Sequence, residues 1–147
     1  MLKNILTLFA LFTMTISEHL AQEAQFTHQD TLRGSVTQER AWWDLNYYHL
    51  DIEVNIAGES IFGKNTIEYT VLKEHNIMQI DLQPPMSIEK VVQKGKEVGF
   101  HREGNAYFIA LTDPQLPGSK NSLEVYYSGK PRIAANPPWD GGFTWEK

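Results

Sequence analysis

The chain has 147 residues, of which 41% are hydrophobic and 21% are charged. This composition is ordinary for a globular protein and argues against disorder, and the length allows one domain or part of a larger protein. The 13 Lys and Arg residues against 18 Asp and Glu residues give a formal net charge of −5. That balance argues against nucleic acid as a partner, because phosphate binding needs a basic surface. Since there is no cysteine, disulfides, thiolate nucleophiles and cysteine-bound metals are excluded.

The amino terminus has the pattern of a secretory signal peptide. Lys3 supplies a positive charge, residues 5–16 are almost entirely apolar, and the polar residues 17–19 follow. The apolar stretch is shorter than the ~20 residues that a membrane-spanning helix needs. We therefore expect residues 1–21 to be a signal peptide cleaved after Ala21, which leaves a periplasmic or extracellular protein with no membrane span. The alternative is a buried amphipathic helix.

The next segment, residues 22–44, is polar and shows no sustained periodicity. We expect a lead-in to the domain here, with the domain proper over residues 45–147. Thr37 is placed to cap a short helical turn over the residues that follow it. Trp42 and Trp43 come too soon afterwards for a long helix.

From Tyr48 onward the chain alternates between apolar and polar residues with the period of two that is typical of a β-strand. After a turn over residues 57–60, residues 61–72 alternate in the same way, so the two segments should form a long antiparallel hairpin. In the second segment we expect Ile67, Tyr69 and Val71 to share one face. In the first segment the residues expected to face the core are Leu50, Ile52, Val54 and Ile56.

Shorter strands should follow at intervals of roughly ten residues. Pro84 and Pro85 end the first of them, because proline lacks the hydrogen-bond donor of a strand. The last but one, residues 106–111, is almost continuously apolar, so we expect it to be central and covered on both faces. The predicted strands are residues 77–82, 87–93, 97–101, 106–111 and 123–127. No stretch after residue 44 has helical periodicity, and the fold class is therefore all-β, a curved antiparallel sheet or sandwich of about seven strands.

The segment after the last predicted strand does not resemble the end of a domain. It contains Trp139, Phe143 and Trp145 among prolines and glycines. Exposed aromatic residues of this kind usually mark a partner surface, and flat rings can also stack on sugars. We expect these residues, like Trp42 and Trp43, to pack against sheet edges and loops.

Motifs that carry catalytic chemistry are missing from the sequence. None of the five histidines begins a His-Glu-x-x-His pattern, and there is no phosphate-binding loop and no Gly-x-Ser-x-Gly elbow. The best local cluster is His49, Asp51 and Glu53, which one strand face would present. A strand spaces such residues ~6–7 Å apart, so we interpret them as a solvated face. We assign no catalytic, cofactor-binding or metal-binding residue.

Several segments, taken together, match a known pattern. They are residues 30–35 (DTLRGS), 39–44 (ERAWWD), 78–85 (MQIDLQPP), 102–106 (REGNA) and 137–143 (PPWDGGF). In this order they resemble the amino-terminal β-domain of exported bacterial zinc aminopeptidases, of the aminopeptidase N and leukotriene-hydrolase family of metallopeptidases. The resemblance covers residues 26 to 147.

The resemblance implies a saddle-shaped β-sheet domain that packs on a thermolysin-like catalytic domain. In such a parent enzyme, which removes amino-terminal residues from peptides, two His and a Glu hold zinc, a further Glu is the general base, and a Gly-x-Met-Glu-Asn loop binds the substrate amine. None of these residues is present here, and the family's substrate-binding glutamine should lie beyond Lys147. The resemblance therefore implies a fragment that is incomplete at its carboxyl end and inactive alone.

The expected partners are the missing catalytic domain and, through the parent, peptide substrates. Zinc is expected only in the full-length parent, and this fragment should hold no cofactor. Two alternatives remain open. One is a free-standing secreted β-sandwich module that binds peptide or glycan, and the other is a purely structural or assembly domain.

Overall fold

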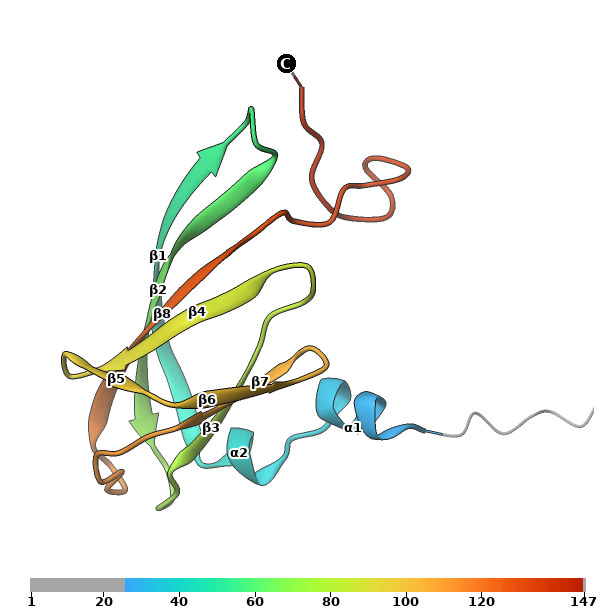
Figure 1. Ribbon diagram of the computed structural model, residues 1–147. Coiled ribbons are helices and arrows are strands. Elements are labelled where there is room, and N and C mark those ends of the chain that lie inside the picture. The colour runs from blue at the N-terminus through green and yellow to red at the C-terminus, as the bar shows by residue number, and fades with distance from the viewer. Residues whose placement is uncertain (1–25, 147) are drawn as a thin grey trace, which may run out of the picture.

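The computed structural model describes residues 26–146, so the expected signal peptide at residues 1–21 lies outside the described residues. The described residues form two short helices and eight strands (Figure 1). The helices are α1 (His28–Gly34) and α2 (Gln38–Ala41), and the strands are β1 (Trp43–Asn55), β2 (Ser60–Val71), β3 (Ile77–Asp81), β4 (Ser87–Gln93), β5 (Lys96–Val98), β6 (Phe100–Glu103), β7 (Ala106–Ala110) and β8 (Lys120–Gly129).

The strands form two antiparallel sheets, which confirms the all-β prediction. The main sheet has the order β1-β2-β8-β4-β5, and the second sheet has the order β3-β7-β6. The predicted hairpin is β1–β2, which pairs from Trp43 opposite Val71 to Asn55 opposite Ser60, with a register shift between Leu45 and Tyr47. Within residues 26–146, no helix is long and apolar enough to cross a membrane.

The second sheet packs on one face of the main sheet, which we call the core face. Its buried residues include Ile67, Tyr69 and Val71, as the alternation in β2 predicts. Each large side chain buried in this way stabilises the fold by about 1.5–3 kcal/mol. The other buried members of the core are Trp42, Met78, Ile88, Val91, Val98, Tyr107, Ile109, Leu111, Leu123 and Val125.

Trp42 and Tyr69 join the lead-in segment to both sheets. The indole of Trp42 lies edge-on to the Tyr69 ring, with the ring centroids 5.8 Å apart, and its Nε1 donates to the carbonyl oxygen of Ile77 at 2.7 Å. The Tyr69 hydroxyl donates to Gln115 Oε1 at 2.8 Å and accepts from Gln93 Nε2 at 3.5 Å. Burial raises the pKa of Tyr69 to about 12. This phenol is therefore a neutral, fully bonded part of the core.

The prediction that Leu50, Ile52, Val54 and Ile56 would be buried is wrong. Their exposed fractions lie between 52% and 55%. Leu50, Ile52 and Val54 do share one face of the sheet, and Ile56 lies in the turn after β1. The hairpin reaches past the second sheet, which covers only the other end of the core face (Figure 1). The apolar alternation therefore indicates which residues face the same way, while the covering layer is absent over this end.

Two further predictions need correction. The segment 97–101, predicted as one strand, belongs to two. The strand is interrupted at Gly99, where the chain passes from β5 of the main sheet to β6 of the second sheet. The strand β7 is central in the second sheet, as expected, but its outer face is covered only in part, since Ala106 is buried there and the residues after it on that face are not. On its outer face Ala110 is exposed, and Phe108 is partly covered by His101, whose ring stacks on it at 5.1 Å.

The lead-in segment is more ordered than predicted. Besides the expected turn, which is α2, it contains the helix α1. A capping box begins α1: Thr27 Oγ1 accepts from the Asp30 amide at 3.2 Å, and the Thr27 amide donates to Asp30 Oδ2 at 3.0 Å. The bond from the Thr27 amide lowers the pKa of Asp30. The Thr-x-x-Asp spacing was the signal that sequence reasoning missed.

Replacing Tyr69 with Phe tests the role of the buried hydroxyl. We expect Tyr69→Phe to lower the free energy of unfolding by about 1–2 kcal/mol, because Gln115 and Gln93 lose a buried partner. Urea denaturation measures the change. The matched control is Tyr47→Phe, since the Tyr47 side chain is exposed and its loss of a hydroxyl should have no measurable effect. Equal stability of both variants would contradict this assignment.

Candidate functional site

A hollow of about 560 Å³ lies between the main sheet and β3. Leu50, Asn65 and Val125, which are register neighbours on β1, β2 and β8, line it from the main sheet. Ile80 of β3 and Leu82, which directly follows β3, line it from the other side. The hollow therefore lies where the second sheet stops covering the core face, and most of its lining is apolar.

Three polar side chains of the main sheet reach this hollow. Tyr48 and Tyr127 have their pKa raised by burial, so both phenols stay neutral and can donate a hydrogen bond. The third is Asn65, whose Oδ1 is buried and has no hydrogen-bond partner among the described residues. A buried acceptor without a partner lowers stability, and because this oxygen is shielded from solvent it is a cost to the fold rather than a group offered to a ligand.

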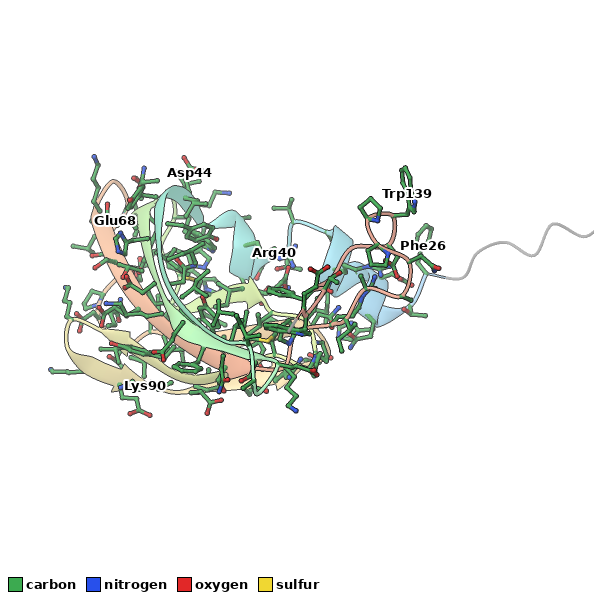
Figure 2. All side chains as sticks on the ribbon, turned by 90° about the horizontal axis from the view of Figure 1, so that it is seen from above. Phe26, Arg40, Asp44, Glu68, Lys90 and Trp139 are labelled. Carbon is green, nitrogen blue, oxygen red and sulfur yellow. The ribbon has the colours of Figure 1, made fainter. Side chains whose placement is uncertain are left out.

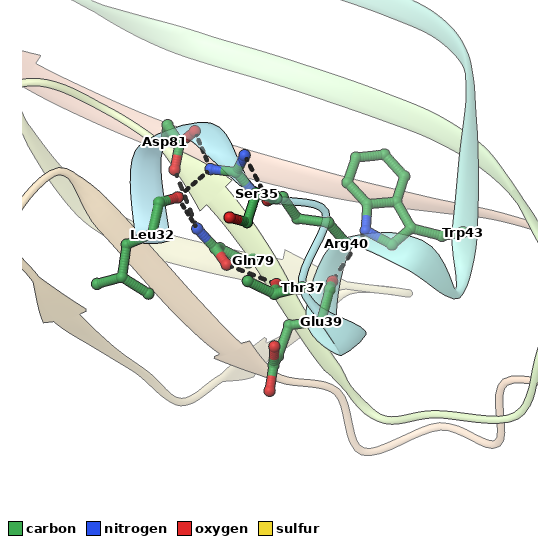
Figure 3. Close-up of polar contacts among 8 residues, drawn as sticks. All are labelled: Leu32, Ser35, Thr37, Glu39, Arg40, Trp43, Gln79 and Asp81. Atoms are coloured by element: carbon green, nitrogen blue, oxygen red, sulfur yellow. Dashed lines mark hydrogen bonds and ion pairs between the residues drawn. The ribbon is translucent and has the colours of Figure 1, made fainter. Parts of the chain in front are cut away.

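The rim of the hollow is closed by a polar network around Arg40 (Figure 3). The Arg40 guanidinium pairs with the Asp81 carboxylate, and it donates to the carbonyl oxygen of Leu32 at 2.8 Å. The buried Gln79 side chain donates to the same carbonyl at 3.0 Å and accepts from the Thr37 hydroxyl at 2.9 Å. These bonds attach both helices to β3. Arg40 and Asp81 are therefore engaged with each other and with the backbone, and they serve the structure rather than substrate chemistry.

The cluster His49, Asp51 and Glu53 lies on the opposite face of β1. His49 Nε2 is 3.3 Å from Asp51 Oδ1, closer than the backbone spacing predicts, because the side chains turn toward each other. Lys64 Nζ lies 3.8 Å from Asp51 Oδ2 and 3.1 Å from Glu124 Oε1, and the bond to Glu124 raises the pKa of Lys64. More than half of the side-chain surface of His49 and of Asp51 is exposed, so these ion pairs contribute little stability.

The tryptophans divide into packed and exposed groups. Trp42 is buried and Trp43 is partly buried against the core, as expected. Trp139 is 87% exposed and points away from both sheets, so the expectation that it packs is wrong (Figure 2). Trp145 stacks on Phe143 with ring centroids 5.5 Å apart. The tail thus folds on itself.

In chemical terms the hollow supports binding more than bond cleavage. The side chains around it are apolar or neutral except for Arg40 and Asp81, which pair with each other. Nucleophilic or acid–base catalysis needs a side chain that is free to exchange a proton, and the paired Asp81 carboxylate does not provide one. Across residues 26–146, no group of three or more His, Cys, Asp or Glu side chains could hold a metal ion.

Replacing Asn65 with Leu tests the unpartnered acceptor. We expect Asn65→Leu to raise the free energy of unfolding by about 1 kcal/mol, because the variant removes a buried oxygen that has no partner. The control is Asn121→Leu, which should lower stability because Asn121 Nδ2 donates to Gln115 Oε1 at 3.0 Å. Thermal and urea denaturation measure both. A loss of stability in Asn65→Leu would show that the oxygen is satisfied.

The comparisons with known proteins agree with the architecture. No protein-family model matches the chain, and no curated protein sequence does either. Among solved structures, an M1 zinc metallopeptidase from Deinococcus radiodurans superposes with a TM-score of 0.60 at 21% identity, covering 73% of this chain and 25% of that one. A variant of an M1 zinc metallopeptidase from the same organism, bound to a Tyr-Ser-Ala substrate, gives a TM-score of 0.57 at 21% identity, with 67% and 22% covered.

A more distant enzyme has the same arrangement. Yeast LTA4 hydrolase superposes with a TM-score of 0.50 at 13% identity, covering 59% of this chain and 14% of the yeast protein. The chain therefore spans a quarter or less of the length of the structures it matches. At these identities the likeness establishes the fold. The chain has the all-β fold of the part of these M1 zinc metallopeptidases that it covers, and it fits the amino-terminal domain that the sequence resembles.

Proposed function

We propose that this chain is the amino-terminal structural domain of a zinc-dependent aminopeptidase that removes amino-terminal residues from peptides. The observation that carries the proposal is the superposition on an M1 zinc metallopeptidase over 73% of this chain. The sequence segments that resemble the family lie inside the region that the structure describes. They include the lead-in residues 39–44, in which Trp42 belongs to the core and Arg40 lies at the rim of the hollow.

The residues that the structure describes do not fit a zinc site. Zinc in proteins needs three or four His, Cys, Asp or Glu ligands that converge at about 2 Å. His49 and Asp51 pair with each other on an exposed strand, and no third ligand joins them within residues 26–146. We therefore place the zinc and the catalytic groups on the rest of the parent protein. In this chain, the sheets would form one wall of the cleft that peptide substrates enter.

The proposal includes the location of the protein. The order of charged, apolar and polar residues at the amino terminus supports a signal peptide over residues 1–21 and a periplasmic or extracellular protein. The lead-in and the domain proper would then be residues 22–44 and 45–147, and the partner of the domain would be the catalytic domain of the same enzyme.

A second candidate is a free-standing secreted module that binds peptide or glycan. The observation that favours it is Trp139, whose ring is 87% exposed. Quenching of tryptophan fluorescence by oligosaccharides, compared between the chain and a Trp139→Ala variant, separates the two candidates. The aminopeptidase proposal expects no saturable quenching in either.

An activity assay tests the absence of a catalytic centre in this chain. The purified chain, with added Zn²⁺, should hydrolyse aminoacyl p-nitroanilides no faster than buffer containing the same Zn²⁺. A zinc aminopeptidase assayed in parallel shows that the substrate and metal are competent. Turnover that depends on zinc and is removed by a chelator would contradict the proposal.

The DNA sequence downstream of codon 147 tests directly whether this chain is part of a zinc aminopeptidase. We expect the reading frame beyond codon 147 to encode a His-Glu-x-x-His segment and a Gly-x-Met-Glu-Asn segment. A stop codon directly after codon 147 would favour the free-standing module instead.

A further inference from the structure

The first strand leaves one long edge of the main sheet unpaired within the described residues. β1 spans 13 residues and pairs only with β2, so its other side presents free backbone N–H and C=O groups. From Tyr47 to Asn55 its register is continuous. This stretch contains no Pro and no Lys, the residues that commonly protect an edge from another strand.

The other edges within residues 26–146 are protected. β5, at the far side of the main sheet, has only three residues and begins with Lys96. β6 has four residues and carries Arg102. β3 has five residues, and the network around Arg40 and Gln79 attaches both helices beside it. The long edge of β1 therefore differs from every other edge in the described part of the chain.

The two faces of β1 differ in chemistry. On the core face, Leu50, Ile52 and Val54 are each more than half exposed, although they are apolar. On the opposite face lie Asp51 and Glu53. Asp51 pairs with His49 Nε2 at 3.3 Å and shares Lys64 with Glu124, while Glu53 forms no ion pair within residues 26–146. The edge therefore presents apolar residues on one face and carboxylates on the other, and Glu53 is the carboxylate without a cationic partner.

We propose that the edge of β1 binds an extended peptide segment in which apolar residues alternate with Lys or Arg. Such a segment would add a strand beside β1 and satisfy its free backbone groups. Since directly opposite residues share a face, its apolar side chains would cover Leu50, Ile52 and Val54, and its basic side chains would lie beside Asp51 and Glu53. This inference does not depend on the proposed peptidase function.

Charge decides between this partner and a second copy of the chain. Each copy carries a formal net charge of −5, so two copies repel each other. An antiparallel pair of β1 strands centred on Asp51, Ile52 or Glu53 would also place carboxylates directly opposite carboxylates. A basic segment has neither penalty, and charge complementarity therefore favours it.

A titration with a synthetic peptide tests the proposal. The probe is a nine-residue peptide in which Val and Lys alternate, added to the isotope-labelled chain and followed by NMR. Saturable shifts of backbone amide signals should be confined to β1 and its neighbour β2. The control peptide has the same composition with all Val residues at one end and all Lys residues at the other, and it should bind at least about tenfold more weakly because it cannot match both faces.

A charge exchange distinguishes strand addition from general attraction between a basic peptide and an acidic protein. Glu53→Lys should weaken binding of the Val-Lys peptide about fivefold, and a Val-Glu peptide should bind this variant better than the unchanged chain. Ile52→Lys should also weaken binding without changing the melting temperature, since Ile52 is 54% exposed.

Three outcomes of the peptide titration would overturn the proposal. They are shifts spread over the whole surface, equal binding of both peptides, and absence of binding. Shifts in β1 that depend on protein concentration without peptide would identify a second copy as the occupant and would overturn it as well. None of these results bears on the activity assay or on the reading frame, so the proposed function stands or falls separately.

Discussion

The fold depends on the packing of a small sheet against one end of a larger one. Trp42 and Tyr69 meet edge-on at that contact, and the Trp42 indole also bonds to β3 of the small sheet. This contact buries one face of β2 and β8, and it attaches the lead-in segment to the domain. Tyr69, Gln115 and Gln79, which are buried in the contact, all have hydrogen-bond partners. Burying these three polar side chains therefore carries little desolvation cost.

The same contact determines where binding can occur. A small sheet of three strands cannot cover a main sheet of five, so the hollow and the apolar end of β1 remain open. Exposed apolar surface of this kind usually marks an interaction surface.

Periodicity predicted the hairpin and the buried face of β2, because alternation shows which residues share a face. It could not show that Leu50 and Ile52 would stay exposed, since coverage depends on how far a distant sheet extends. Gln79 stands at a polar position of β3 and is nevertheless buried, which is tolerated because its amide donates to a carbonyl oxygen of the lead-in segment. The capping box at Thr27 was readable, but it begins a helix of only seven residues in a polar segment with no apolar period. The hollow joins residues far apart in the chain, and no motif marks it.

Native-state hydrogen exchange of the dilute chain tests the central claim most directly, because it measures the stability of each strand separately. If the small sheet covers only one end of the core face, amides of β2 opposite Leu123 and Val125 should exchange only through global unfolding. Amides of the uncovered part of β1, around Leu50 and Ile52, should exchange through local opening. The free energy of that opening should be lower than that of global unfolding by about 2 kcal/mol or more. Uniform protection from β1 through β8 would show that the apolar end is covered, and it would contradict the account.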